Sequence, residues 1–544
     1  MAHKVTHKIE IAPFVHTPVE DIPQIAVSLR NTFRTLKTKD VQYRLVQLRK
    51  LYWGLSDLTP KFLEALKQDL NKPEHDSHIS EVGWAMQDCM HGIRNVEKWA
   101  ADDPNVDIPI HMRIIKPRIR KEPLGAVLII GTYNFPVNLT VCPLIGAIAA
   151  GCPAVVKPSE GSPRTAIVLK ELVDNYLDPS AYQVVNGAVP ETTALLNEKW
   201  GKIFYTGGEN VAKIISKKAA ETLTPVTLEL GGKNPAFISK NADLTLASRR
   251  LLWGKTQTAG QVCMSANYIN VDREVLDDFI RVLNAVYDGM FPKGAQASPD
   301  YARIVNHQHF DRMKKMLDET KGKIVLGGET DRDDLFIAPT AVLVDSHHDS
   351  MVQQESFGPI FAILPYDNVD NAIEIVNEVD PTPLSMQTFG NFDENNKLLN
   401  AITSGGASFN DSYMHGASPT LPFGGVGTSG QGAYRGKASF DTFTHFRTVT
   451  DTPGWADKLM NVRYMPYDVS ELKQYLWLNG GKPDFDREGK QITGVGYWSW
   501  LVLGLGGPTA KGALFRWLLV LAGGYAYMKG FKLNLRSLLL GPRE

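Results

Sequence analysis

The chain is 544 residues long, which exceeds one ordinary hydrophobic core and predicts about two to four domains. Its charged fraction of 22% and its net charge of −1 are those of a globular protein and give no electrostatic reason to expect nucleic acid as a partner. Its four cysteines are too few for a disulfide framework and contain no close pair of the kind that binds zinc, so the composition favours a reducing compartment.

The N-terminal part of the chain predicts helices followed by an extended arm. Residues 1–18 lack the apolar core of a signal peptide, so we expect the catalytic part to face the cytosol. After Asp40, a plausible N-cap, apolar residues recur at helical spacing to about Leu70. At residues 108–121, isoleucines and charged residues intermingle around two prolines, which fits partly exposed strands better than a helix.

The centre of the chain alternates between short apolar runs and helical stretches. The first set of runs lies at residues 126–130, 154–156, 182–185, 203–205 and 226–230. After Gly232, further runs lie at residues 268–271, 338–344 and 360–364. Such alternation is typical of a parallel sheet with helices on its faces, so the sequence predicts two α/β domains. Farther on, a glycine-rich turn at residues 421–427 precedes a predicted strand at residues 439–449.

Three segments carry groups suited to acyl chemistry. The tetrapeptide Gly-Gln-Val-Cys ends at Cys263 and supplies a sulfur nucleophile, and Leu-Glu-Leu-Gly-Gly-Lys places Glu229 at the end of a strand. The apolar run at residues 126–130 leads into Gly-Thr-Tyr-Asn-Phe-Pro, which contains Asn134. One thiol, one amide and one carboxylate suffice to form a thioester and to hydrolyse it. The other three cysteines stand in apolar or helical contexts and are expected to be buried.

Together these segments resemble the aldehyde dehydrogenase superfamily, whose patterns are an Asn-Phe-Pro turn, a Glu-Leu-Gly-Gly-Lys segment and a Gly-Gln-x-Cys loop. The resemblance runs in order from about Leu45 to Arg463. It implies an α/β fold with a Rossmann-like cofactor domain, an α/β catalytic domain and a β arm that serves oligomerisation, followed here by an apolar C-terminal tail. It also implies that the strand at residues 439–449 pairs with the arm at residues 108–121, and that both take part in a homodimer.

On this resemblance the chain divides into five parts. They are a cofactor-binding domain at residues 1–230, with a bridging β arm at about 106–122; a catalytic domain at 231–428; a returning oligomerisation strand and the start of the tail at 429–465; a gatekeeper-type helix and linker at 466–494; and an apolar tail at 495–544. Within the fourth part, residues 469–478 have an amphipathic helical pattern, and the resemblance implies that this helix caps a substrate tunnel.

The resemblance implies a role for each of the three chemical groups. Cys263 would attack an aldehyde carbon as a thiolate, and the resulting alkoxide would accept hydrogen bonds from Asn134 and from the backbone N–H of Cys263. A nicotinamide cofactor would take a hydride and leave an acyl thioester. Glu229 would be the general base that activates the hydrolytic water.

Lys157 and Glu160 are expected to hold the adenine ribose of the cofactor. They belong to a Lys-Pro-Ser-Glu segment that matches the family. Because the charge of Glu160 would repel a 2′-phosphate, NAD is the expected cofactor, and Lys157 leaves NADP possible.

A glycine-containing turn after the run at residues 203–205 is expected to face the pyrophosphate through its N–H groups. It contains Gly207, Gly208, Val211 and Ala212. The family pattern is Gly-Ser-x-x-Val-Gly, so Gly208 replaces a serine and Ala212 replaces the last glycine. The added methyl group could crowd either the helix packing or the phosphate.

The nicotinamide end of the cofactor is expected at Glu355 and Phe357. Their segment Glu-Ser-Phe-Gly-Pro resembles the family's Glu-x-Phe-Gly-Pro, in which the glutamate holds the nicotinamide ribose and the phenylalanine bounds the ring. None of the thirteen histidines forms a His-Glu-x-x-His pattern or pairs with cysteine at ligand spacing, so no metal site is expected.

The resemblance is strongest to the class 3 branch, and in particular to the fatty aldehyde dehydrogenases, at residues 223–229, 421–427 and 440–445. It implies NAD-dependent oxidation of medium- to long-chain fatty aldehydes to carboxylic acids. Three alternatives remain open: a dehydrogenase for aromatic aldehydes or semialdehydes in a biosynthetic pathway, a non-redox cysteine acyltransferase or hydrolase, and a membrane-tethered scaffold. The acyltransferase would need a histidine partner for Cys263 and would leave the cofactor residues without a purpose.

The C-terminal tail has the composition of a membrane-associated segment. From residue 495 to 528 only Lys511 and Arg516 are charged, and aromatic residues stand near the ends of its two apolar halves. Neither half, 495–510 or 514–528, reaches the roughly 20 residues of a relaxed span. A hairpin in a lipid monolayer, one tilted span made from both halves, and a helix pair buried in the protein remain as alternatives. A membrane-associated enzyme would keep its catalytic domain cytosolic on the endoplasmic reticulum, a lipid droplet or the mitochondrial outer membrane.

Overall fold

The computed structural model describes residues 9–104, 107–479, 483, 485–491, 494–495 and 510–528. The chain divides into two compact units. Unit 1 comprises residues 1–101 and 121–445, and unit 2 comprises residues 102–120 and 446–544.

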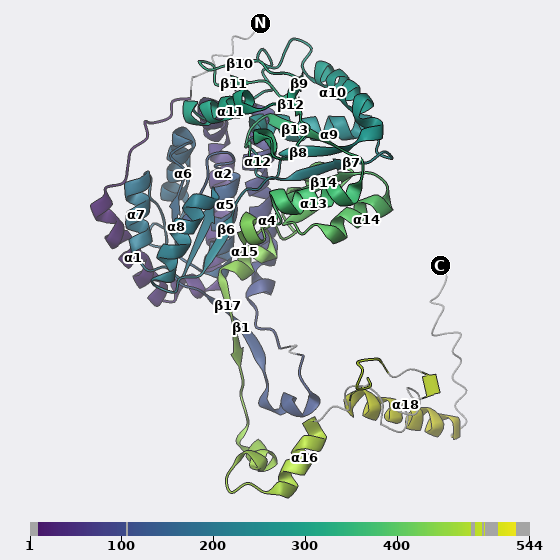
Figure 1. Cartoon of the computed structure of the whole chain (residues 1–544). Coiled ribbons are helices and arrows are strands. Elements are labelled where there is room, and N and C mark those ends of the chain that lie inside the picture. The colour runs from purple at the N-terminus through teal and green to yellow at the C-terminus, as the bar shows by residue number, and fades with distance from the viewer. Residues whose placement is uncertain are drawn as a thin grey trace, which may run out of the picture. The chain divides into compact units, whose positions relative to one another are not determined.

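Unit 1 contains a six-stranded sheet with the strand order β16-β6-β5-β2-β3-β4 (Figure 1). Its strands are β2 (Val127–Ile130), β3 (Ala154–Lys157), β4 (Tyr182–Val184), β5 (Lys202–Thr206), β6 (Val226–Glu229) and β16 (Gly430–Gln431). Only β16 is antiparallel to its neighbour. In β2, Val127 and Ile129 belong to one core cluster, and Leu128 and Ile130 belong to another. The strand is thus buried on both faces, which explains why it forms a continuous apolar run in the sequence.

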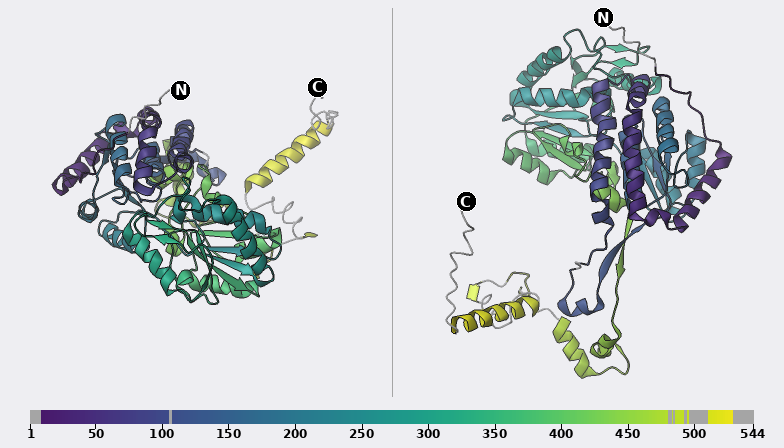
Figure 2. Two further views of the ribbon diagram at one scale, coloured as in Figure 1. Left: turned by 90° about the horizontal axis from the view of Figure 1, so that it is seen from above. Right: turned by 180° about the vertical axis from the view of Figure 1, so that it is seen from behind.

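Helices cover both faces of this sheet. They are α1 (Ile22–Arg34), α2 (Val41–Leu70), α4 (Gly83–Ala100), α5 (Asn138–Ala150), α6 (Pro163–Tyr176), α7 (Val189–Asn197), α8 (Glu209–Ala220) and α15 (Lys437–Thr442). The short helix α3 (Glu74–Ser77) and the π-helix η3 (His78–Val82) connect α2 to α4, and Figure 2 shows α2 and α4 side by side. The predicted N-cap is confirmed, because Asp40 Oδ1 accepts a hydrogen bond from the N–H of Gln42 over 2.9 Å.

A second sheet of unit 1 has seven strands in the order β15-β14-β7-β8-β13-β12-β9. They are β7 (Pro235–Ile238), β8 (Tyr268–Asp272), β9 (Lys323–Leu326), β12 (Thr340–Leu343), β13 (Ile360–Tyr366), β14 (Ser385–Phe389) and β15 (Gly406–Phe409). Only β9 is antiparallel to its neighbour. The associated helices are α9 (Leu244–Thr256), α10 (Leu276–Met290), α11 (His307–Glu319), α12 (Ser350–Gln353), α13 (Val369–Val379) and α14 (Phe392–Ala401), and β10 (Thr330–Asp331) pairs with β11 (Phe336–Ile337). The predicted α/β fold with two parallel sheets is confirmed.

The strand β14 was not apparent from the sequence. Its Ser385, Gln387 and Thr388 are fully buried (0% exposed), so it lacks the apolar run that marks the other strands. The amide of Gln387 is satisfied by donation to the carbonyl of Met264 over 2.8 Å. Burial of polar side chains depends on such partners, which only the tertiary structure supplies.

The strands β1 (Arg118–Pro123) and β17 (Thr444–Val449) form a two-stranded sheet. Two local predictions around them were wrong. Ile110–Ile115 is a 3-10 helix rather than a strand, because Pro109 provides its N-cap and Lys116, with φ 43°, ends it in the left-handed region before Pro117. The first residues of the predicted strand at 439–449 belong to α15, where Phe440 is buried in the core.

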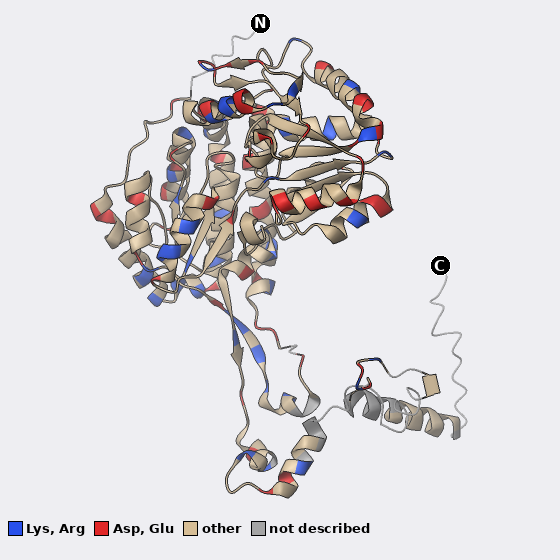
Figure 3. Cartoon of the chain, viewed as in Figure 1, with Lys and Arg blue, Asp and Glu red and all other residues tan. Residues whose placement is uncertain are grey.

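Unit 2 also contains η9 (Gly454–Arg463), α16 (Val469–Asn479) and α18 (Ala510–Met528). The helix predicted at residues 469–478 is confirmed as a helix, whereas the apolar half predicted at 495–510 lies almost wholly outside the described residues. Among the helices that the structure describes, none combines the length and apolarity needed to cross a membrane. The part of α18 that is coloured in Figure 3 contains no charged residue, and its Leu518, Leu519, Val520 and Leu521 are 55–63% exposed.

Candidate active site

A pocket of about 320 Å³ in unit 1 contains side chains that follow the carboxyl ends of β2, β5 and β6. Its lining residues are Thr132, Tyr133, Asn134, Leu139, Thr206, Gly207, Gly208, Glu229, Leu230, Gly231, Cys263, His309, Arg312, Glu355 and Phe357. Ligands of open α/β sheets bind at this edge. Asn134, Glu229 and Cys263, which lie far apart in the sequence, therefore meet in one cavity. Four of the predicted cofactor residues, Lys157, Glu160, Val211 and Ala212, are not among its lining residues.

The loop that carries Cys263 contains a left-handed backbone turn, which the side-chain amide of Gln261 holds. Thr258, Ala259 and Gly260 all have positive φ, and a Cβ on Gly260 would lie 2.3 Å from the carbonyl oxygen of Gly358. The buried Gln261 donates to the carbonyl of Thr258 (2.9 Å) and to that of Arg303 (3.0 Å). This side chain therefore holds the left-handed turn in place ahead of the cysteine.

Cys263 is partly exposed, whereas the other three cysteines are buried as predicted. Burial of its sulfur, together with the negative charges of Glu355 and Glu229, raises the pKa of the Cys263 thiol to about 12, and Arg435 acts in the opposite direction. A thiol whose pKa is raised needs a proton acceptor to become a nucleophile.

Asn134 and Asn234 orient the polar groups around the thiol. Asn134 is 1% exposed, and its Nδ2 donates to the carbonyl of Gln261 over 2.8 Å. An amide NH₂ has two hydrogens, so a second donor remains on Asn134. Asn234 Nδ2 donates to the carbonyls of Cys263 (2.7 Å) and Ser265 (3.0 Å), which fixes the backbone at the cysteine. Sequence reasoning missed Asn234, although it directly follows the Glu-Leu-Gly-Gly-Lys segment.

Glu229 occupies the end of β6 and is 2% exposed. Within the described part of the chain, neither of its carboxyl oxygens has a hydrogen-bond partner. Burial raises the pKa of Glu229 well above its ordinary value, and the positive charge of Arg435 partly opposes this shift. A buried carboxyl group without a protein partner is suited to accept a water molecule.

Arg435 is a buried cation that no sequence motif pointed to. It is 3% exposed, and its guanidinium carbon lies 4.5 Å from the ring centroid of Trp84 and 5.1 Å from that of Tyr434. Such cation–π contacts stabilise a charge that has left water. Its charge lowers the pKa values of both Glu229 and Cys263.

Glu355 is held by a backbone N–H group and by the side chain of Arg312. Glu355 Oε1 accepts a hydrogen bond from the N–H of Gly232 over 3.1 Å, and Arg312 donates to the carbonyl of Glu355 over 2.8 Å. Burial raises the pKa of Glu355 to about 7, although this N–H group and the charges of Arg312 and Lys255 lower it. Burial likewise lowers the pKa of Lys255 to about 7.

Phe357 lies beside the ring of Tyr133 and has a strained backbone, with φ 43°. Its ring packs edge-on against Tyr133 at 6.0 Å between centroids, and Tyr133 also contacts His309 at 5.1 Å. The three rings form an aromatic wall of the pocket.

The turn that opens α8 can approach a phosphate group. Gly208 is the N-cap of α8 and makes no side-chain cap, and a Cβ at this position would meet no atom within 4 Å. Uncapped N–H groups at a helix N-terminus bind anions. Ala212 is buried in the core cluster beneath the helix, so its methyl group packs there rather than toward the pocket, and Val211 is 44% exposed. These residues fit a dinucleotide cofactor.

Lys157 ends β3 and forms an ion pair with Glu160. The Lys157 side chain is 4% exposed and the Glu160 side chain is 46% exposed. The carboxylate of Glu160 is therefore accessible to a ligand at the carboxyl edge of the sheet, as expected for a contact to ribose hydroxyls.

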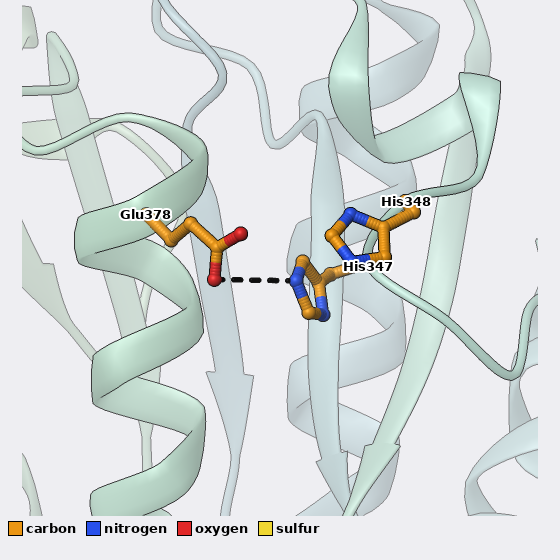
Figure 4. Close-up of side chains that lie close together, drawn as sticks. All are labelled: His347, His348 and Glu378. Atoms are coloured by element: carbon orange, nitrogen blue, oxygen red, sulfur yellow. Dashed lines mark ion pairs between the residues drawn. The ribbon is translucent and has the colours of Figure 1, made fainter.

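One group among the described residues has side chains that could hold a metal ion, namely His347, His348 and Glu378 (Figure 4). His347 Nε2 lies 3.4 Å from Glu378 Oε2. None of the three residues lines the pocket, so they take no part in the site described here.

Comparison with known proteins agrees with this geometry. The model of the aldehyde dehydrogenase family matches residues 4–449. The chain is 57% identical over 525 residues to the β-apo-4′-carotenal oxygenase of Neurospora crassa, which covers 96% of this chain and 98% of that protein. It is 40% identical over 448 residues to aldehyde dehydrogenase family 3 member A2 of Rattus norvegicus, with 82% and 91% of the two chains covered.

Among solved structures, the substrate-bound AldH of Staphylococcus aureus is similar, with a TM-score of 0.78 and 38% identity over 81% of this chain and 98% of that one. The predicted resemblance is thereby confirmed. This protein belongs to the aldehyde dehydrogenase family and is an oxidoreductase that acts on aldehydes.

Proposed function

We propose that this enzyme oxidises a long, hydrophobic aldehyde to the carboxylic acid, with NAD as hydride acceptor and Cys263 as nucleophile. The observation that carries the proposal is the meeting of Cys263, Asn134 and Glu229 in one pocket with the glycine turn that opens α8. Family membership favours this oxidation over the non-redox acyltransferase and the inactive scaffold.

The first step is attack of the Cys263 thiolate on the aldehyde carbon. Because burial raises the pKa of this thiol to about 12, its proton must pass to a nearby acceptor, and the carboxylates of Glu229 and Glu355 are the candidates. The alkoxide that forms accepts hydrogen bonds from the second N–H of Asn134 and from the backbone N–H of Cys263. Glu355 and Phe357 would hold the nicotinamide end of the cofactor, which would supply a hydride acceptor when bound.

Hydrolysis of the thioester requires a water and a base on the same side of the pocket. Glu229 has two buried oxygens without a partner among the described residues, so it can orient such a water and accept its proton. Glu355 accepts a hydrogen bond from the N–H of Gly232 and would contact the cofactor ribose.

The residues that would bind the cofactor lie at the carboxyl edge of the six-stranded sheet. The uncapped N-terminus of α8 would hold the pyrophosphate, and Lys157 with Glu160 would hold the adenine ribose. The negative charge of Glu160 favours NAD over NADP. Aldehyde dehydrogenases as a family use either cofactor.

The substrate class is supported by the relatives and by the tail. A relative that is 57% identical is named for a long polyene aldehyde, β-apo-4′-carotenal, so a carotenoid-derived aldehyde is the first candidate. Medium- to long-chain fatty aldehydes are the second candidate, because class 3 motifs and the exposed leucines of α18 favour a membrane-soluble substrate. Aromatic aldehydes and semialdehydes form the third class.

One assay separates these classes. NADH formation should be measured with β-apo-4′-carotenal, hexadecanal, benzaldehyde and succinic semialdehyde in mixed micelles. We expect the two long aldehydes to have the largest kcat/KM, with the polyene ahead. A preference for benzaldehyde or succinic semialdehyde would contradict the proposed substrate class.

We also propose a homodimer built on β1 and β17, and a membrane or lipid-droplet location with the catalytic domain in the cytosol. α18 and the exposed residues Val469 and Leu476 of α16 would supply the apolar surface for lipid. Flotation of the intact protein with liposomes in a density gradient, compared with a chain ending before Val495, tests the location. If the two chains float with liposomes to the same extent, the proposed role of the tail in this location is contradicted.

A further inference from the structure

The segment that carries Asn134 is held by a buried ion pair from the N-terminal helices. Lys72 Nζ lies 2.9 Å from Glu81 Oε1, and both side chains are 0% exposed. Lys72 follows α2, and Glu81 belongs to the π-helix η3, a feature that is frequent at functional sites. Neither residue lines the pocket.

Glu81 caps the helix that follows Asn134. The N-cap residue of α5 is Val137, whose side chain cannot accept a hydrogen bond. Glu81 Oε2 takes this role by accepting bonds from the N–H groups of Val137 (3.1 Å) and Asn138 (2.9 Å). A carboxylate at this position also interacts favourably with the helix dipole. The start of α5 is therefore determined by a side chain from another element.

Lys72 contacts the other end of the same turn. Its ammonium group lies 4.0 Å from the ring centroid of Phe135, within cation–π range. Phe135 directly follows Asn134, whose amide bonds the cysteine loop at Gln261. The ion pair thus contacts the turn at Phe135, Val137 and Asn138, immediately after Asn134.

We propose that Lys72 and Glu81 are positioning residues that fix the amide of Asn134 for oxyanion stabilisation, acting through the turn at residues 135–138. This inference rests on the proposed function, in which Asn134 donates to the oxyanion. Such a donor is effective only if it already points at the place where negative charge develops. Loss of the cap would let the turn shift, and a displacement of about 1 Å can slow a reaction about 100-fold.

The variant Glu81→Gln removes the charge and keeps the shape of the side chain. We expect kcat/KM for the aldehyde, expressed per NAD-binding site, to fall about 10- to 100-fold, with an unchanged NAD dissociation constant. A purely structural role would reduce the number of NAD-binding sites and leave the kcat/KM of each remaining site unchanged. That result would overturn the proposal.

A double-mutant cycle with Asn134 tests the route of the effect. Asn134→Ala alone should lower kcat/KM about 100- to 1000-fold. Adding Glu81→Gln to it should have little further effect, because the two residues act in series. Additive losses would show that Glu81 acts elsewhere and would overturn the inference. An unchanged rate in Asn134→Ala would instead contradict the proposed function, whatever Glu81→Gln does.

A double variant keeps the proposal testable if Glu81→Gln alone fails to fold. If Glu81→Gln does not fold, Lys72→Met/Glu81→Gln leaves no unpaired buried ion and should fold. We expect the same loss of kcat/KM in it, and a wild-type value would overturn the proposal.

Asp69→Asn is the matched control, because Asp69 caps the start of α6 in the same way, through the N–H groups of Arg164 (3.0 Å) and Thr165 (2.8 Å). At saturating NAD its kcat/KM per site should be unchanged. A loss as large as that of Glu81→Gln would show that loss of any carboxylate cap slows the enzyme, and the specific link to Asn134 would be overturned.

Discussion

Two carboxyl groups of the pocket differ in what holds them. Glu229 at the end of β6 has no hydrogen-bond partner among the described residues, whereas Glu355 accepts a bond from the N–H of Gly232 over 3.1 Å. Burial raises the pKa of each, that of Glu355 to about 7, and different cations oppose the shift, Arg435 for Glu229 and Arg312 for Glu355. An unpartnered carboxyl group is free to bind a water, while a partnered one is placed to hold a ligand. This difference supports the proposal that Glu229 serves hydrolysis and that Glu355 contacts the cofactor.

The largest effect should come from removing the sulfur of Cys263, which lines the same pocket as both carboxyl groups. Cys263→Ser should lower aldehyde oxidation by at least about 10⁴-fold, because an unactivated hydroxyl cannot replace the thiolate. NAD binding should persist, as measured by fluorescence titration. Cys89→Ala, which removes a buried thiol outside the pocket, should stay active. Near wild-type oxidation by Cys263→Ser would exclude the proposed nucleophile.

Glu229→Gln should separate the two carboxylates kinetically. Steady-state turnover should fall about 10²- to 10⁴-fold through loss of the base, while one equivalent of NADH per site still forms before turnover stalls at the thioester. Stopped-flow absorbance measures both phases. Glu355→Gln, in contrast, should raise the KM for NAD and slow the first turnover. If Glu229→Gln loses the first turnover as well, Glu355 becomes the candidate base.

Protonation of Glu355 should make stability depend on pH. Because its pKa rises from 4.5 to about 7 on folding, the folded state binds the proton more tightly. The tighter proton binding by Glu355 therefore adds to the free energy of unfolding fully below pH 4.5, and this contribution is lost as pH rises to about 7. As pH rises from 5 to 8, the free energy of unfolding of Glu355→Gln should therefore increase by about 2 to 3 kcal/mol relative to that of the wild type. Urea unfolding at both pH values measures the gain, and a constant difference would contradict the raised pKa.

The smallest effect is expected at Glu160, whose side chain is half exposed and whose charge is screened by water. Glu160→Gln should narrow the preference for NAD over NADP by about two- to fivefold, because it removes repulsion of the 2′-phosphate. The ratio of kcat/KM with the two cofactors measures this change. An unmodified enzyme that prefers NADP would contradict the assigned role of Glu160.

Much of the architecture was predictable because strands buried on both faces must be apolar throughout. The runs that became β2, β5 and β13 were recognised for this reason. β14 escaped prediction because its buried Ser385 and Gln387 depend on hydrogen-bond partners from distant segments. The 3-10 helix Ile110–Ile115 was missed because local propensity and a proline on each side fit both a strand and a turn.

The sequence by itself determined which groups are present for acyl chemistry and where each stands on a strand end or loop, since Asn134, Glu229 and Cys263 lie in local motifs. Only the tertiary structure decided their protonation and orientation. Burial sets the pKa of Cys263 and Glu229, and the cation that opposes those shifts, Arg435, lies in no motif. Likewise, the helix that follows Asn134 is capped by Glu81, which is 53 residues before Asn134 in the chain. Electric fields and helix caps act through space, so they follow from the fold rather than from neighbouring residues.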